Sequence, residues 1–273
     1  MEILGYFLSI LIGVSLGLIG GGGSILTVPV LVYVMGINPV LSTAYSLFVV
    51  GGTALVGSLS YARQKLLDYR TALVFGAPSI ASVYLTRKII VPVIPDTIAT
   101  FGSFALTKNL FIMLLFAVLM VIASFSMIRK GKPQNGTNVA DKPKRYNYPL
   151  ILLEGIVVGA LTGLVGAGGG FLIIPALVLL AGLPMKQAVG TSLLVIAAKS
   201  LIGFTGDLGT QTMNWPFLLL FTAFATGGIF IGSALSKRIS GEKLKPAFGW
   251  FVLVMGAYIL LKELFLSPIN GAH

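Results

Sequence analysis

A glycine-rich apolar motif occurs twice in this chain, with the two copies 146 residues apart. Residues 13–57 align with residues 159–203 without a gap, and 16 of the 45 aligned positions are identical. The identities include glycines and a proline in register, among them Gly20 with Gly166. Hydrophobic composition alone would align leucines by chance, but not this set. We therefore interpret the chain as two homologous halves.

Both copies of the motif lie in strongly apolar sequence. Of the 273 residues, 56% are hydrophobic and 10% are charged, whereas a soluble domain carries about 25% charged residues. Apolar runs of about 20 residues recur along the chain, as in membrane-spanning helices. We therefore predict an all-α polytopic membrane protein with about five membrane segments in each half. The expected segments are 4–19, 24–36, 42–60, 69–85, 109–128, 148–165, 170–181, 186–205, 215–235 and 247–265.

The duplication predicts three regions along the chain. These are an N-terminal transmembrane repeat (1–128), a basic linker (129–147) and a C-terminal transmembrane repeat (148–273). The linker is rich in Gly, Pro, Asn and Lys, so it should be a mobile loop on the cytoplasmic side, where basic loops are retained. The net charge of +11 has the same explanation, and nucleic acid is not an expected partner.

The distribution of basic residues predicts that the two halves are inverted in the membrane. The loop at 63–70 is basic, whereas its counterpart at 206–214 has no basic residue. The basic loop of the second half comes one span later, at 237–245. The charge thus changes sides between the halves, which places both termini outside. Arg87 and Lys88 run against this pattern, because they would face outside.

The glycine clusters should break the helices that contain them. One helix from residue 4 to 37 would be about 51 Å long, well beyond a hydrocarbon core of about 30 Å. Non-helical backbone is tolerated at that depth only where protein or a watery cavity covers it, and a helix that begins at such a break can bind an anion. Tight glycine packing without a ligand is the alternative. The predicted substrate-binding residues at the breaks are Gly22, Gly23, Ser24, Gly168, Gly169 and Gly170.

Polar side chains follow each break in the next span. Ser46 and Ser192 match across the repeat and could bind substrate oxygens, although such hydroxyls often bond a preceding carbonyl. Lys199 lies deep in its span, where an unpaired cation costs at least about 2.5 kcal/mol. We predict that Lys199 binds an anionic substrate. The alternatives are that it reaches the membrane interface or pairs with a carboxylate.

Three further charged residues have less specific interpretations. Glu154, about six residues into its span, could pair with Lys199, carry a coupling proton or lie near the membrane surface. Arg63 could gate the cytoplasmic mouth or simply anchor the protein at the membrane surface. Asp207 is expected in a loop, capping a helix end.

The motifs "GLIGGGGSILTVPVLV" and "GLVGAGGGFLIIPALV", followed by "STAYSLFVV" and "GTSLLVIAAKSLIGF", resemble the TauE/SafE family of membrane transporters. The resemblance covers roughly residues 4–265. It implies secondary transport of a small anionic sulfur compound, such as sulfite, a sulfonate or a related organosulfur acid, across the cytoplasmic membrane by alternating access. A passive anion channel, a transporter of a different small anion, and a membrane-embedded enzyme or accessory subunit are the alternatives.

The sequence offers little material for metal or nucleotide chemistry. It contains no cysteine and a single histidine, His273, so it cannot form a His/Cys cluster. It also has no GxxxxGK phosphate-binding loop. We therefore predict no catalytic residue, no cofactor and no metal site. The expected partners are the lipid bilayer and the anionic substrate; a coupling ion, proton or sodium, is left unassigned.

Overall fold

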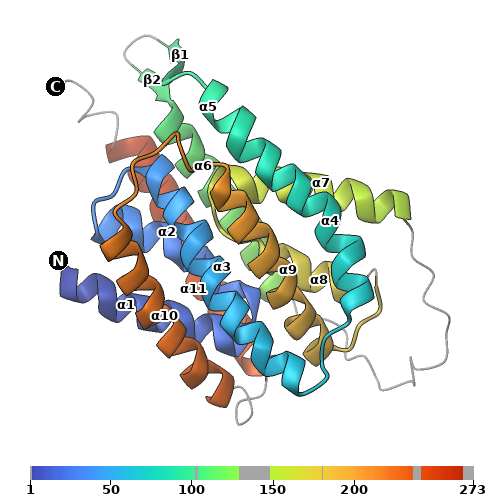
Figure 1. The fold of residues 1–273 in the computed structure, drawn as a ribbon. Coiled ribbons are helices and arrows are strands. Elements are labelled where there is room, and N and C mark those ends of the chain that lie inside the picture. Colours follow the sequence, from blue (N-terminus) through green and yellow to red (C-terminus); the bar gives the residue numbers. More distant parts are fainter. Residues whose placement is uncertain (1, 102–103, 129–147, 180, 236–240, 267–273) are drawn as a thin grey trace.

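The structure, a computed structural model, describes residues 2–101, 104–128, 148–179, 181–235 and 241–266. Nearly all of this is helical (Figure 1). Each of the ten predicted apolar segments corresponds to helical structure with bounds within a few residues, except that α11 begins at Gly241 instead of residue 247, and the all-α polytopic architecture is confirmed. The α-helices are α1 (Glu2–Ile19), α2 (Thr27–Pro29), α3 (Pro39–Arg63), α4 (Tyr69–Leu85), α5 (Val91–Val93), α6 (Lys108–Ile128), α7 (Tyr148–Val165), α8 (Gly170–Leu179), α9 (Met185–Thr205), α10 (Trp215–Leu235) and α11 (Gly241–Leu261).

Several segments depart from regular α-helix. A 3-10 helix, Gly21–Leu26, precedes α2, and π-helical turns follow α2, α4 and α11 at Val30–Val34, Thr86–Ile90 and Lys262–Leu266. A β-hairpin of β1 (Thr97–Phe101) and β2 (Phe104–Thr107) separates α5 from α6. This hairpin was not predicted from the sequence, although the β-branched residues of β1 favour a strand.

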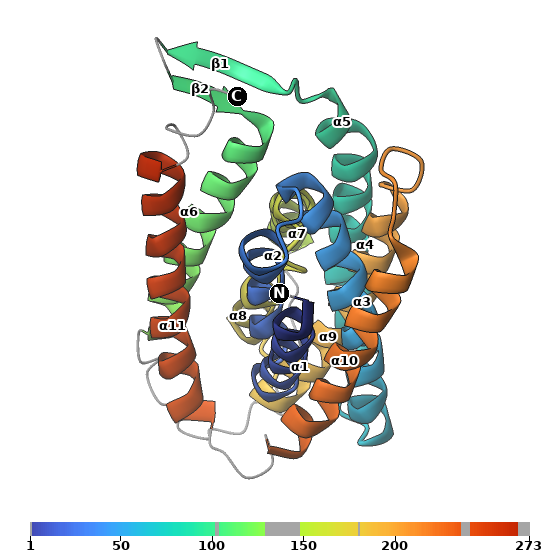
Figure 2. The same ribbon diagram turned by 90° about the vertical axis from the view of Figure 1, so that its left-hand side faces the viewer.

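Matched helices of the two halves occupy equivalent places. The 146-residue offset relates α1 to α7 and α3 to α9, and the order along the chain relates α4 to α10 and α6 to α11. α1 packs on α10, and α7 packs on α4, which is the same contact with the halves exchanged. α3 packs on its own counterpart α9, and α6 on α11, as Figure 2 shows. The duplication is therefore visible in the packing.

Helices that match across the repeat run in opposite directions where they meet. In α3, Gly51 packs against Leu201 and Gly57 packs against Leu193, so α3 and α9 are antiparallel. In α11, Gly249 packs against Met127 near the end of α6, and Gly256 packs against Met120 further back, so this pair is antiparallel too (Figure 2). This arrangement bears on the orientation of the halves in the membrane.

Glycines bring two other helix pairs into close backbone contact. A Cβ added at Gly232 of α10 would overlap the carbonyl oxygen of Val14 in α1. In α7, a Cβ at Gly159 would lie 2.6 Å from the carbonyl oxygen of Ser79 in α4. Small residues at such interfaces are typical of membrane helices, whose association depends on close packing. These glycines lie outside the breaks, and their role is close packing between helices.

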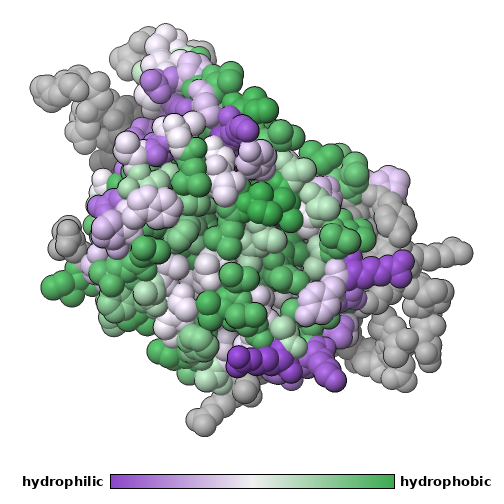
Figure 3. Space-filling view, in the orientation of Figure 1, coloured by the Kyte–Doolittle hydropathy of each residue, from purple (hydrophilic) through white to green (hydrophobic). Residues whose placement is uncertain are grey.

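The outer surface suits a lipid environment. Apolar side chains cover the middle of the face in Figure 3, and polar side chains gather toward its ends. Within the described residues, five helices are long and apolar enough to cross a membrane. They are Pro39–Arg63, Tyr69–Val93, Lys108–Phe125, Met185–Thr205 and Trp215–Leu235. The predicted linker 129–147 lies outside the described residues, so the division into three regions stays a prediction.

Candidate substrate site at the two helix breaks

The two glycine-rich breaks meet inside the protein. Gly21 lies so close to Gly170 that a Cβ on either residue would overlap the Cα of the other. Gly168 adjoins Ser24, since a Cβ added at Gly168 would lie 3.4 Å from the Cβ of Ser24. The fold thus brings predicted site residues of both halves together, although they are far apart in sequence. In this conformation the contact between the breaks is direct.

The first break is a left-handed residue followed by a 3-10 helix. Gly20 has a φ of +74°, a conformation that costs glycine little and other residues more. Gly22, Gly23 and Ser24 then lie within the 3-10 helix. The Ser24 hydroxyl donates a 2.7 Å hydrogen bond to the Gly21 carbonyl, so it stabilises the break itself. Gly23 packs against the backbone of α1 at Leu16.

The second break is a tighter turn. Gly166, Gly168 and Gly169 all have left-handed φ values, of +70°, +63° and +71°. The Gly169 N–H donates to the Ala167 carbonyl at 2.7 Å, and α8 begins at the next residue. The N–H of Leu172 donates to the Gly169 carbonyl at 3.0 Å. The Gly169 N–H, one of the backbone donors predicted to bind an anion, is thus used within the turn.

The two matched serines make different hydrogen bonds. The Ser46 hydroxyl donates to the Gly166 carbonyl at 2.7 Å and so ties α3 to the second break. The Ser192 hydroxyl donates to the Val189 carbonyl, 2.8 Å away in its own helix. A hydroxyl has one hydrogen to donate. In this conformation both serines can accept a further hydrogen bond, but neither can donate one to an anion.

Lys199 lies at the second break. Its side chain is fully buried, and a Cβ added at Gly169 would lie 2.6 Å from its Nζ atom. Nζ donates a 3.0 Å hydrogen bond to Thr162 Oγ1 in α7. In the described part of the chain no carboxylate forms an ion pair with Lys199. The lysine therefore neither reaches the surface nor pairs with Glu154, and two of its three N–H groups have no described partner.

Glu154 and Arg63 lie apart from this contact. Glu154 lines a hollow between α4, α7, α8 and α9, which Ser79 also lines. Its Oε2 atom and the Ser79 hydroxyl are buried without a hydrogen-bond partner in the described structure. Arg63 is exposed at the last residue of α3.

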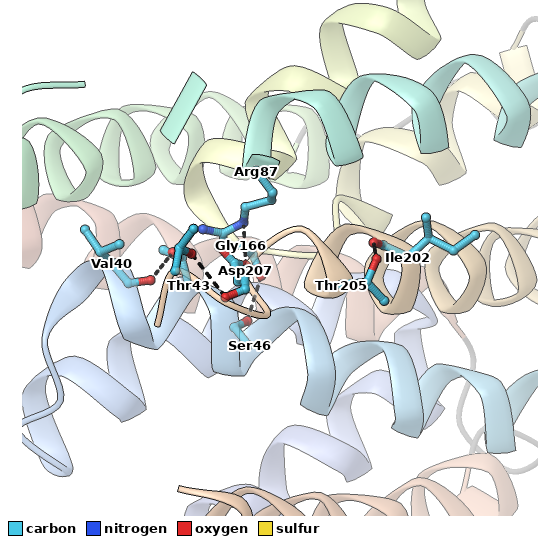
Figure 4. Close-up of polar contacts among 9 residues, drawn as sticks. Val40, Thr43, Ser46, Arg87, Gly166, Ile202, Thr205 and Asp207 are labelled. Atoms are coloured by element: carbon cyan, nitrogen blue, oxygen red, sulfur yellow. Dashed lines mark hydrogen bonds and ion pairs between the residues drawn. The ribbon is translucent and has the colours of Figure 1, made fainter. Parts of the chain in front are cut away.

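A buried ion pair near the second break was not predicted from the sequence. Arg87, in the π-helical turn after α4, is 0% exposed, and its Nε atom lies 3.4 Å from Asp207 Oδ2 (Figure 4). Burial raises the pKa of the Asp207 carboxyl, while the Arg87 guanidinium acts in the opposite direction. One expectation is corrected: Asp207 lies in a loop as predicted, but its carboxylate faces Arg87 instead of a helix end. Arg87 is buried inside the protein, and the side of the membrane on which it lies stays a prediction. The sequence signal was weak, because Arg87 stands beside a second basic residue, Lys88, and Asp207 is a single acid between apolar spans.

Two matched sets of membrane helices, meeting at broken segments beside a buried cation, are typical of transporters with internal repeats. Residues 6–259 match the family described as "Sulfite exporter TauE/SafE", and the chain belongs to this family. A Xylella fastidiosa (strain Temecula1) protein named "Probable membrane transporter protein" is 29% identical over 261 residues, covering 93% of this chain and 92% of that protein.

A second relative leads to the same conclusion. The Bacillus subtilis protein "Probable membrane transporter protein YunE" is 27% identical over 274 residues, covering 94% of this chain and 97% of its own length. No solved structure matches the chain. The predicted family is confirmed. The protein is a multi-pass membrane transporter and not an enzyme.

Proposed function

We propose that the protein is a secondary transporter of a small anionic sulfur compound, such as sulfite, a sulfonate or a related organosulfur acid, in the cytoplasmic membrane. The family description supports the sulfur chemistry. The observation that carries the anion preference is Lys199, a fully buried lysine whose Nζ atom has one hydroxyl partner in the described structure. A buried cation in a membrane protein is stabilised when an anion binds next to it and neutralises its charge.

The proposed site lies between the breaks. The substrate would contact the backbone at Gly22, Gly23, Gly168, Gly169 and Gly170, together with the side chains of Ser24, Ser46, Ser192 and Lys199. Because Gly21 and Gly170 touch in this conformation, the breaks must separate before a substrate can enter. A ligand that binds only the separated state shifts the equilibrium toward it. Ser46 would then exchange its bond to the Gly166 carbonyl for one to the substrate.

Alternating access follows from an inverted arrangement of the halves. The antiparallel packing of α3 with α9 supports this inversion, because matched helices of an inverted repeat point in opposite directions. Rocking of one half against the other would then expose the site to each side in turn. Arg63, exposed at the end of α3, remains a candidate at the cytoplasmic mouth, where an anchoring role fits equally well.

Glu154 is the candidate for ion coupling. Its carboxylate has a buried oxygen without a described partner, and it shares a hollow with the Ser79 hydroxyl, which also lacks a described partner. A proton or a sodium ion would satisfy both groups. Transport by Glu154→Gln that continues down a substrate gradient, but no longer responds to a proton or sodium gradient, would support this role.

Counterflow in proteoliposomes tests the proposal directly. Vesicles loaded with unlabelled sulfite or sulfoacetate should accumulate external labelled compound transiently, because a carrier exchanges substrate and an open channel does not. The ligands are first ranked by thermal shift of the purified protein with sulfite, sulfate, thiosulfate, taurine, sulfoacetate and neutral analogues. Flux without counterflow would favour the anion channel. Stabilisation by neutral analogues alone would contradict an anion site.

A further inference from the structure

The guanidinium group of Arg87 is buried but incompletely paired. Its Nε atom contacts Asp207 Oδ2 at 3.4 Å without the geometry of a hydrogen bond, and its Nη1 and Nη2 atoms have no hydrogen-bond partner in the described structure. A guanidinium normally binds a carboxylate through two parallel N–H groups. Here the outer fork of Arg87 is unused. A buried charged donor without a partner is costly, so this fork calls for a further ligand.

The Asp207 carboxylate is held near Arg87 but is not tightly bound to it. Its Oδ2 atom is likewise buried without a hydrogen bond in the described structure. The local turn is maintained by the backbone, because the Asp207 carbonyl accepts from the N–H of Thr210 at 3.1 Å and of Gln211 at 3.3 Å. The turn can therefore form without the carboxylate. Asp207 can leave Arg87 without unfolding its own loop.

This ion pair adjoins the second break. Thr86, next to Arg87 in the chain, packs against Gly163, three residues before Gly166. Figure 4 shows the Arg87 side chain extending toward Gly166 and Asp207. Lys199 lies at the other end of the same break, at Gly169. Two buried cations therefore flank the second break, and a single carboxylate accompanies them in the described structure.

We propose that Arg87 is a second substrate-binding residue and that Asp207 is an internal competitor, which occupies Arg87 until an oxyanion displaces it. This inference rests on the proposed anion transport. Because a guanidinium fork matches two oxygens on one centre, Arg87 selects a sulfonate, carboxylate or similar oxyanion over a halide. The exchange replaces one anion by another, so Arg87 keeps a counter-ion throughout. Without substrate, the Asp207 carboxylate stays beside the Arg87 guanidinium and blocks it.

Binding to the purified full-length protein tests the pair, with sulfoacetate as the probe and chloride as the comparison. Asp207→Asn removes the competitor and should tighten sulfoacetate binding about ten-fold, while Arg87→Gln should weaken it by at least about ten-fold. The double variant Arg87→Gln/Asp207→Asn removes both buried charges, so it should fold even where a single variant does not. It should still bind sulfoacetate poorly. Lys88→Gln, an exposed neighbour on the same turn, is the charge-matched control and should bind normally.

The outcomes separate this inference from the proposed function. If the double variant binds and transports as the wild type does, Arg87 and Asp207 form only a structural ion pair and the inference is wrong. If Lys199→Met abolishes binding while the double variant binds normally, anion transport stands and this inference alone fails. If the wild-type protein binds no oxyanion, both fail. Equal affinity for chloride and sulfoacetate would contradict the role of the fork.

Discussion

The two helix breaks have the same origin in sequence and different chemistry in the structure. Both begin with a left-handed glycine, Gly20 in one half and Gly166 in the other. The first continues as a 3-10 helix, and the second as a turn with two further left-handed glycines. Lys199 lies at the second break, whereas the matched position in the first half is Thr53. The duplication preserved the break but not the charge.

Because of this difference, we expect the two halves to contribute different groups to the proposed anion site. In the first half, Thr27 and Thr53 are buried hydroxyls without a described hydrogen-bond partner. In the second half, Lys199 has unused donors, whereas the other buried cation beside the second break, Arg87, comes from the first half. A charge at only one of two matched breaks would fix the orientation of a bound anion. Substitutions at matched positions of the two halves can therefore separate the effect of the glycine breaks on stability from the effect of the charge on anion binding.

The largest expected effect is steric, at Gly166. Alanine there would be left-handed and would overlap the backbone of Thr43, so we expect a loss of stability of about 2–5 kcal/mol. At Gly20 the atoms nearest to the added Cβ belong to the side chains of Val189 and Ile174 and not to the backbone. Gly20→Ala should therefore lower the free energy of unfolding clearly less than Gly166→Ala. Thermal unfolding in detergent measures both.

Gly182→Ala is the control for this comparison. Gly182 is left-handed, at +64°, but nothing lies within 4 Å of an added Cβ. Its cost should be the backbone strain alone, about 1 kcal/mol. If Gly166→Ala is no worse than Gly182→Ala, the close contact between Gly166 and Thr43 does not hold the second break in place.

The second comparison is between Lys199 and its match Thr53. Lys199→Met keeps the stem of the side chain and removes the charge, so the ligand-free protein should become more stable, by about 1–2 kcal/mol. Oxyanion binding should fall at least about ten-fold, because a buried charge contact is lost. Thr53→Val should change binding little. Isothermal titration with sulfite and thermal unfolding without ligand measure the two effects. If folded Lys199→Met binds sulfite with unchanged affinity, Lys199 is not part of the substrate site.

The sequence predicted the helices and both breaks, because apolar runs and glycine clusters act locally. It also placed Lys199 deep in an apolar span, but the burial of its side chain beside Thr162 depends on how α7 and α9 pack. It did not predict the contact between Arg87 and Asp207. These residues are 120 positions apart and meet only because the end of α4 packs near the loop after α9. The bond from Ser46 to Gly166 was missed for the same reason, because it joins the two halves.

The smallest expected effect separates the matched serines. Ser46→Ala would leave the buried Gly166 carbonyl without the partner that joins α3 to the break, at a cost of about 1–2 kcal/mol. Ser192→Ala removes a bond within one helix turn, where such bonds add little, so we expect less than about 0.5 kcal/mol. Thermal unfolding of the two variants in the same detergent measures the difference.

Substrate binding sharpens this serine comparison, because both residues belong to the proposed site. If Ser46 exchanges its carbonyl bond for a substrate oxygen, Ser46→Ala should lower sulfite affinity as well as stability. A variant that loses stability with unchanged affinity would assign Ser46 to the architecture of the second break alone. Equal losses in both serine variants would contradict the asymmetry, since only Ser46 bonds across the halves.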